Sequence, residues 1–199
     1  MIIFQGPNKK IVFIHIPKNS GRYIRQCISA NHRVLYSFWD VGKIDRAHIP
    51  FSMRKIFITS PNQYRYFTFV RNPYDRFISA FKYKFPRAST SQMKEFIINI
   101  LPTYTFDNQY NPKIIHFYPQ YMFLVNEKNE LNEIHKKIEV KKLENIKNFK
   151  IFPVPNFKLT KYNYNDYFNQ ECIDILNEVY KQDFESFKYP LITYKADIE

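Results

Sequence analysis

Two short apolar runs, each followed by a loop and an amphipathic stretch, constrain the fold of this chain most. Residues 10–16 have the sequence KIVFIHI, a continuous apolar run that is too short for a helix and is typical of a buried parallel strand. A loop follows at 17–21, and Ile24, Cys27 and Ile28 then share one face of a helix. A strand, a loop and a helix in this order indicate an α/β unit.

The same order recurs in the middle of the chain. Residues 66–70 (YFTFV) predict a second buried strand. In the helix expected next, Asn72 suits the N-cap, Pro73 the first helical position and Asp75 the third, where a negative charge is favourable. An apolar stripe over residues 77–81 continues this helix.

The rest of the chain predicts smaller elements. We expect a helix over 113–125, a short strand over 138–143 and a late helix over 170–187. Residues 84–112 and 150–165 contain several Pro and Asn residues with little periodicity, so we expect loops and short helices there.

The composition supports one globular domain. The 199 residues are enough for one substantial core and few for two, and 45% of them are hydrophobic, which excludes a disordered chain. No apolar stretch approaches the ~20 residues of a membrane-spanning helix, and the run at 2–4 is too short for a signal peptide. We therefore predict a single α/β domain over residues 1–199, with a central parallel sheet flanked by helices, in a soluble cytoplasmic protein without a membrane anchor.

The net charge of +12 favours an anionic partner, such as a nucleotide, an acidic glycan, nucleic acid or a membrane surface. AT-rich codons also produce many lysines, so the charge alone does not decide the function. No recognised nucleic-acid motif is present, and we expect no nucleic-acid partner. Cys27 and Cys172 have no metal-ligand spacing and exclude a disulfide framework, so we expect a reduced chain and no metal.

The loop at 17–21 has the chemistry of a phosphate-binding turn. Gly21, one of 3 glycines in the chain, lets the backbone approach a ligand closely. The helix after it presents unpaired amides and a partial positive charge, and Lys18 adds a full charge. The Walker A pattern GxxxxGKS/T is absent. An ordinary turn with a solvated lysine explains this segment, taken alone, equally well.

Arg71 and Ser79 form a second signal. Arg71 follows the second predicted strand at its carboxyl end, where ligands of open α/β sheets bind. Ser79 lies about two helical turns further along, on the same face as Asp75. A guanidinium and a hydroxyl can jointly hold a phosphate dianion. The alternative, which is the more ordinary for each residue taken singly, is an ion pair between Arg71 and Asp75 with Ser79 facing solvent.

Both segments resemble the nucleotide-binding signatures of the sulfotransferases, enzymes that use 3′-phosphoadenosine 5′-phosphosulfate (PAPS). Residues 15–21 (HIPKNSG) and 69–79 (FVRNPYDRFIS) are similar to the carbohydrate (Golgi-type) branch in particular, which implies a P-loop-like nucleotide-binding fold. Further segments extend the likeness, in the expected order, over most of the chain: 45–51 (DRAHIPF), 116–120 (HFYPQ), 142–145 (KLEN) and 180–187 (YKQDFESF).

The resemblance implies roles for the matching residues. Lys18 would contact the oxygen that bridges phosphate and sulfate, and Arg71 and Ser79 would hold the 3′-phosphate. The 5′-phosphosulfate would be surrounded by Asn19, Ser20, Gly21, Arg22 and Tyr23. The chain departs from the usual loop at three of these positions, because Ser20 replaces a glycine and Arg22 and Tyr23 replace small hydroxyl residues.

Sulfuryl transfer to a hydroxyl needs a group that removes a proton, and a histidine suits this near neutral pH. The resemblance points to His48, whereas the sequence alone does not separate His48 from His116, and a carboxylate is a further candidate. His15 ends the first strand and is more simply explained as a packed residue. His32 and His135 have polar neighbours and are expected at the surface.

We therefore expect a sulfotransferase that moves a sulfuryl group from PAPS to a hydroxyl of a glycan or glycan-like acceptor, with Lys18 and His48 as catalytic residues. A nucleotide-dependent phosphotransferase, a homologue that binds the donor without turnover and, last, a nucleic-acid-binding module are the alternatives. A group of lysines within residues 136–142 could bind an acidic acceptor, although a solvated basic face is the simpler explanation. The group comprises Lys136, Lys137, Lys141 and Lys142. The acceptor and the oligomeric state do not follow from the sequence.

Overall fold

The structure, a computed structural model, describes residues 1–38, 46–56, 58, 60, 63–106, 111–125 and 138–192. The chain divides into two units, of which the first comprises Met1–Arg71 and Tyr110–Leu159 and the second Asn72–Gln109 and Thr160–Glu199. The loop at 17–21 and Arg71 therefore belong to the first unit, and Ser79 to the second. The organisation of residues 1–199 as one domain stays a prediction.

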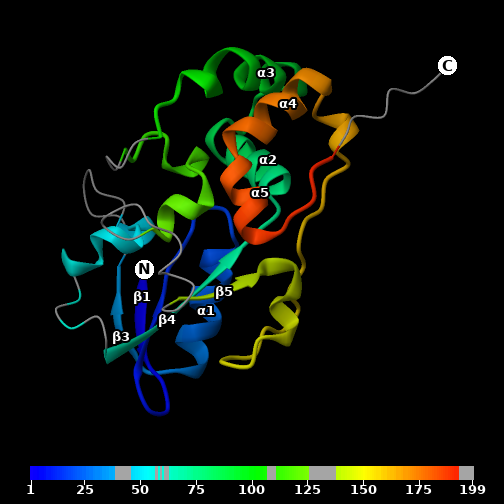
Figure 1. Ribbon diagram of the computed structural model, residues 1–199. Coiled ribbons are helices and arrows are strands. Elements are labelled where there is room, and N and C mark those ends of the chain that lie inside the picture. The colour runs from blue at the N-terminus through cyan, green and yellow to red at the C-terminus, as the bar shows by residue number, and fades with distance from the viewer. Residues whose placement is uncertain are drawn as a thin grey trace. The chain divides into compact units, whose positions relative to one another are not determined.

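The first unit is built on a mixed five-stranded sheet (Figure 1). Its order is β3-β1-β2-β4-β5. The strands are β1 (Ile2–Gln5), β2 (Lys10–Phe13), β3 (Val34–Ser37), β4 (Tyr64–Val70) and β5 (Ile138–Lys142). β2, β4 and β5 are parallel, which confirms the parallel arrangement for the three strands that the sequence predicts. β1 is antiparallel to both β2 and β3, so the sheet is mixed, and the prediction of a central parallel sheet needs correction for this part.

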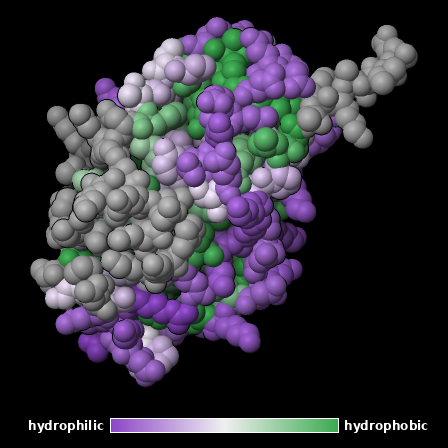
Figure 2. Space-filling model, viewed as in Figure 1, coloured by the Kyte–Doolittle hydropathy of each residue, from purple (hydrophilic) through white to green (hydrophobic). Residues whose placement is uncertain are grey.

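β1 escapes prediction because its apolar run is only three residues long. It is nevertheless an inner strand, joined to β2 by a hairpin in which the Gly6 N–H donates to the Lys9 carbonyl oxygen at 3.0 Å. A Cβ added to Gly6 would lie 2.7 Å from that oxygen, so the close approach requires glycine. The exposed turn carries mainly hydrophilic residues, at the bottom of the view in Figure 2.

The core of the first unit lies between one face of the sheet and α1 (Gly21–Asn31). The predicted apolar face of this helix is confirmed, because Ile24, Cys27 and Ile28 are all buried. The ring of Phe67, in the middle of β4, lies 5.2 Å from the ring of Phe13 on β2. Both cysteines of the chain are buried and free.

The second unit consists of helices. They include α2 (Pro73–Lys84), α3 (Thr90–Glu95), a π-helical turn (Phe96–Ile100), α4 (Gln170–Val179) and α5 (Lys181–Phe187). The predicted helix over 170–187 is therefore two helices, which break at the buried Tyr180 although no Gly or Pro marks the place. The start of α2 is as predicted, because the Asn72 side chain caps it by accepting a hydrogen bond from Tyr74 N at 3.0 Å.

The predicted helix over 113–125 is wrong. The chain instead forms two 3₁₀ turns, Ile115–Phe117 and Gln120–Phe123. Pro119 separates them, because a proline disfavours the helical conformation in the residue before it, and Tyr118 has ψ of 138°. None of the helices in the described part of the chain has both the length and the apolar character that crossing a membrane requires.

Candidate functional site

The carboxyl ends of β2 and β4 lie side by side, because the two strands are parallel neighbours. The contact continues past β2, where Ile14 N donates to the Phe67 carbonyl oxygen at 3.0 Å and Thr68 Oγ1 donates to the Ile14 carbonyl oxygen at 2.8 Å. The loop that carries Lys18 and the residue Arg71 therefore leave the same edge of the sheet. Open α/β sheets bind their ligands at this edge.

The backbone of the loop between β2 and α1 is shaped for an anion. Lys18 and Ser20 both have left-handed backbone conformations, with φ of 67° and 56°. A left-handed residue directly before a helical one turns successive N–H groups toward one side, which forms an anion-binding nest. The first helical hydrogen bond runs from Ile24 N to the Ser20 carbonyl oxygen at 3.0 Å, so the amides of residues 21–23 have no partner within the helix.

The electrostatics at the start of α1 also favour an anion. In this helix, all of which the structure describes, the first turn has no acidic residue and the Ser20 side chain makes no capping hydrogen bond. α2 differs, because Asn72 caps it and Asp75 lies in its first turn. The positive end of the α2 dipole is thus met by the chain's own side chains, whereas the first turn of α1 has neither a capping side chain nor an acidic residue.

Two buried amide side chains tie the loop to the end of β4. Asn19 is 1% exposed, and its Nδ2 donates to the Phe69 carbonyl oxygen at 2.7 Å and to Gln120 Oε1 at 2.8 Å. Gln120 is fully buried, and its Nε2 donates to the Arg71 carbonyl oxygen at 2.8 Å while its Oε1 accepts from Arg71 N at 2.9 Å. Sequence reasoning missed Gln120 as a site residue, although it stands in the segment HFYPQ that supports the resemblance.

Asn19 and Arg71 are thus brought together. Arg71 itself is 4% exposed, so its guanidinium is a buried charge at the sheet edge. Asn19 Oδ1 is also buried, and it has no hydrogen-bond partner among the described residues. Lys18, next to Asn19 in the loop, is half-buried.

Gly21 is required by its neighbour His15. A Cβ added to Gly21 would lie 1.7 Å from His15 Nε2, so the imidazole occupies the space that any larger residue would need. The ring of His15 also stacks on Phe13 at 5.8 Å. His15 is therefore a packed residue, as the sequence suggests, but the predicted strand over 10–16 is too long, because β2 ends at Phe13 and His15 lies two residues beyond it.

The remaining predicted donor-binding residues lie in different surroundings. Arg22 is exposed. The hydroxyl of Tyr23 donates to the Pro155 carbonyl oxygen, and its ring lies 5.2 Å from that of Phe157, so this side chain packs against a neighbouring segment. Ser79 is partly buried on α2 in the second unit, and its role stays a prediction.

Three histidines gather beside the loop. The ring centroids of His15 and His48 are 4.2 Å apart, and those of His48 and His116 are 5.6 Å apart. His48 Nδ1 lies 2.9 Å from the His15 carbonyl oxygen. Because a carbonyl oxygen can only accept, Nδ1 carries the proton, and Nε2 of His48 keeps its lone pair.

Burial keeps two of these rings neutral. It lowers the pKa of His48 to about 3, against the opposing hydrogen bond to the His15 carbonyl and with a further contribution from His116. Burial and the nearby His48 lower the pKa of His15 well below its usual value. Among the described residues no group of three or more His, Cys, Asp or Glu side chains could hold a metal ion.

The other two histidines lie apart from this cluster. His32 is partly exposed, with its Nε2 at 2.9 Å from the Ile151 carbonyl oxygen and its ring 4.9 Å from that of Phe4, so the prediction of a surface histidine is confirmed only in part. His135 lies outside the described residues.

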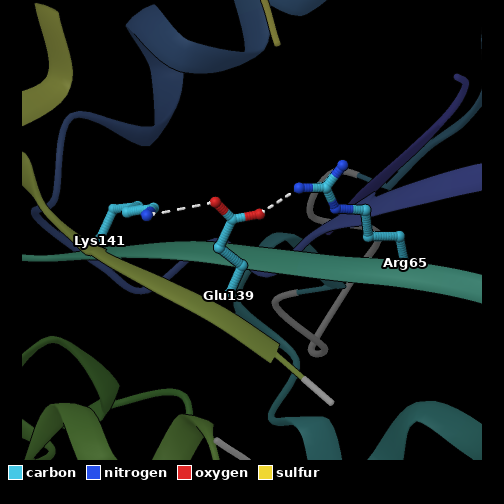
Figure 3. Close-up of polar contacts among 3 residues, drawn as sticks. All are labelled: Arg65, Glu139 and Lys141. Atoms are coloured by element: carbon cyan, nitrogen blue, oxygen red, sulfur yellow. Dashed lines mark hydrogen bonds and ion pairs between the residues drawn. The ribbon is translucent and has the colours of Figure 1, made fainter. Parts of the chain in front are cut away.

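Glu139 and Lys141 on β5 are paired within the sheet. Glu139 forms ion pairs with Arg65 on β4 at 2.5 Å and with Lys141 at 3.3 Å (Figure 3). Partial burial opposes ionisation of Glu139, but the two cations outweigh it and hold the pKa of this carboxyl below its usual value. Lys141 is thus part of an internally paired face, whereas Lys136 and Lys137 lie outside the described residues.

The comparisons with known proteins agree with the resemblance of the two loop segments. A model with the description "Sulfotransferase family" matches residues 2–190, which include both loops, every strand and every helix described above. Neither the curated proteins nor the solved structures include a significant match to the chain. Because the family match spans nearly all of its length, the chain belongs to the sulfotransferase family, whose reaction is the transfer of a sulfuryl group.

Proposed function

We propose that the protein transfers a sulfuryl group from PAPS to a hydroxyl of a glycan or glycan-like acceptor, for which an acidic glycan would suit the net charge. The observation that carries the proposal is one sheet edge with two cationic features, the Lys18 loop and the buried Arg71, linked through Gln120. PAPS carries anionic groups at two separate places, the 5′-phosphosulfate and the 3′-phosphate. A binding site for it therefore needs two cationic features rather than one.

The residues of the first loop fit the 5′-phosphosulfate. The amides of residues 21–23 supply hydrogen-bond donors at the positive end of α1, and the left-handed backbone of Ser20 turns them toward one side. The exposed Arg22 adds a cation. Tyr23 contributes its amide rather than its hydroxyl, which is committed to Pro155. Asn19 holds the loop in place through its hydrogen bonds to the Phe69 carbonyl oxygen and to Gln120.

The second feature receives the 3′-phosphate. Arg71 offers a planar guanidinium that matches two phosphate oxygens at once. Ser79, the seventh residue of α2, is proposed to add a hydroxyl donor. Arg71 follows β4 directly, which fixes its backbone at the sheet edge.

Lys18 and His48 are proposed to carry the chemistry. His48 Nε2 takes the proton from the acceptor hydroxyl, since the bond from Nδ1 to the His15 carbonyl leaves Nε2 as the basic atom. Lys18 offsets the charge that develops on the 5′-phosphate oxygen as its bond to sulfur breaks and the acceptor oxygen bonds to sulfur. A pKa of about 3 makes His48 a weak base, and the negative charge of the bound donor raises this pKa because an anion favours the imidazolium.

Thermal unfolding with nucleotides tests the donor. We expect 3′-phosphoadenosine 5′-phosphate (PAP) to raise the melting temperature more than ATP or ADP at the same concentration, by roughly 5–10 °C at 100 times its Kd. Lys18→Ala and Arg71→Ala should each remove most of this shift and abolish transfer from PAPS, while unfolding cooperatively on their own. Stronger stabilisation by ATP with Mg²⁺ would favour the phosphotransferase instead.

Transfer of labelled sulfate from PAPS to a panel of desulfated glycans tests the acceptor. Labelling of a glycan hydroxyl supports the proposed class. Binding of PAP without transfer to any member would favour the homologue that has lost turnover.

A further inference from the structure

We infer that Gln120 and Asn19 form a positioning clamp, which holds Arg71 at a fixed place relative to the Lys18 loop and thereby sets the preference for a nucleotide with a 3′-phosphate. The inference rests on the proposed function and deepens it. Gln120 acts through the backbone of Arg71, so it is a positioning residue rather than a catalytic one.

The hydrogen bonds of Gln120 fix both sides of one residue. Its Oε1 accepts from Arg71 N at 2.9 Å, and its Nε2 donates to the Arg71 carbonyl oxygen at 2.8 Å. A rotation of the Arg71 backbone about φ or ψ would break one of these bonds. The direction in which the Arg71 side chain leaves the backbone is therefore set by an amide from a distant 3₁₀ turn, Gln120–Phe123.

Asn19 links this arrangement to the phosphate loop. Its Nδ2 donates to the same Gln120 Oε1 at 2.8 Å and to the carbonyl oxygen of Phe69, two residues before Arg71, at 2.7 Å. The side-chain amide nitrogen of Asn19 thus links the loop both to β4 and to Gln120. Since Lys18 is the neighbour of Asn19, the spacing between the two cationic residues is set by this set of short bonds.

A side chain that only filled space would not need these bonds. Methionine has nearly the volume and length of glutamine and would fill the site without desolvating an amide. A fully buried glutamine is stable only where its polar atoms are paired, as they are here. Because the Gln120 side chain pairs with both backbone groups of Arg71, we infer that it serves to orient Arg71.

The test is the ratio of the affinities for PAP and for 5′-AMP, which lacks the 3′-phosphate. We expect wild type to prefer PAP by about tenfold or more, since a charge-assisted pair is at stake. Gln120→Met should reduce this ratio by about tenfold, chiefly by weakening PAP, with little change for 5′-AMP. Ile146→Ala is the control, because Ile146 is buried in the core of the same unit and its truncation lowers stability without touching the clamp.

The outcomes are distinguishable. A ratio that falls in Gln120→Met and stays in Ile146→Ala supports the clamp. A wild-type preference that survives in Gln120→Met overturns the clamp alone, whereas equal wild-type affinities overturn the proposed donor as well. If Gln120→Met does not fold, Gln120→Asn carries the test, since it keeps the amide but is too short to reach Asn19 and Arg71 together; an unchanged ratio in that variant would also overturn the clamp.

Discussion

Ser20 stores backbone strain at the start of α1. Its φ of 56° and ψ of 25° lie in the left-handed region, at a position where the resembling loops have glycine. A residue with a Cβ pays on the order of 1 kcal/mol for this conformation. The same conformation turns the loop amides toward one side, so the strain is located where the anion is proposed to bind.

Replacing Ser20 by glycine should therefore stabilise the free protein. We expect Ser20→Gly to raise the free energy of unfolding by about 0.5–1 kcal/mol, measured by urea denaturation. Ser29→Gly, the same change at an exposed position inside α1, should lower it by about 0.5 kcal/mol, the difference between the helix propensities of Ser and Gly. A loss of stability in both variants would contradict the left-handed conformation of Ser20.

At the scale of elements, local signals explain what the sequence predicts well. α2 begins as expected because Asn72, Pro73 and Asp75 all act within one turn, and β2 and β4 follow from their continuous apolar runs. The elements that the sequence does not predict depend on partners distant in the chain. β3 is only half-buried and pairs with β1, whose own apolar run is short, so neither strand has a strong pattern.

The α2 cap offers a direct test of such a local signal. Asn72→Ala should lower the free energy of unfolding by about 1 kcal/mol, because the N–H of Tyr74 loses its acceptor. Asn72→Asp keeps an acceptor at the cap and should stay close to wild type. Urea unfolding followed by circular dichroism measures both, and equal losses in the two variants would count against the capping role.

The candidate site shows the same division between local and distant signals. Lys18 and Arg71 follow from strand ends and loops, which are local patterns. Gln120 does not, because an amide in an aromatic segment becomes informative only when the fold places it against Arg71. Likewise, only the fold brings together His15, His48 and His116.

For the whole molecule, the buried His15 and the half-buried His48 make stability depend on pH. The folded state holds the pKa of His48 at about 3 and that of His15 well below 6.5, whereas both regain ordinary values on unfolding. Between these values the unfolded state binds more protons, so stability is full above about pH 6.5 and falls as the pH is lowered. Glu139 does not affect this pH range. Its pKa is lowered in the folded state, so its contribution to stability is lost only under more acidic conditions.

We expect the free energy of unfolding to fall by about 2 kcal/mol for His48 alone between pH 7 and pH 5, with His15 adding to the loss. Urea titrations at pH 7, 6 and 5 measure it. His48→Gln should show a shallower dependence than wild type. Stability that is flat over this range, or a variant as steep as wild type, would contradict a desolvated, neutral His48 in the folded state.

The central claim is that two cationic features hold opposite ends of one nucleotide, and the affinities of wild type, Lys18→Ala and Arg71→Ala for PAP and 5′-AMP test it most directly. Arg71→Ala should bind PAP only as well as 5′-AMP, about 10- to 100-fold more weakly than wild type, whereas Lys18→Ala should weaken both nucleotides alike. An Arg71→Ala protein that still prefers PAP as strongly as wild type would contradict the account.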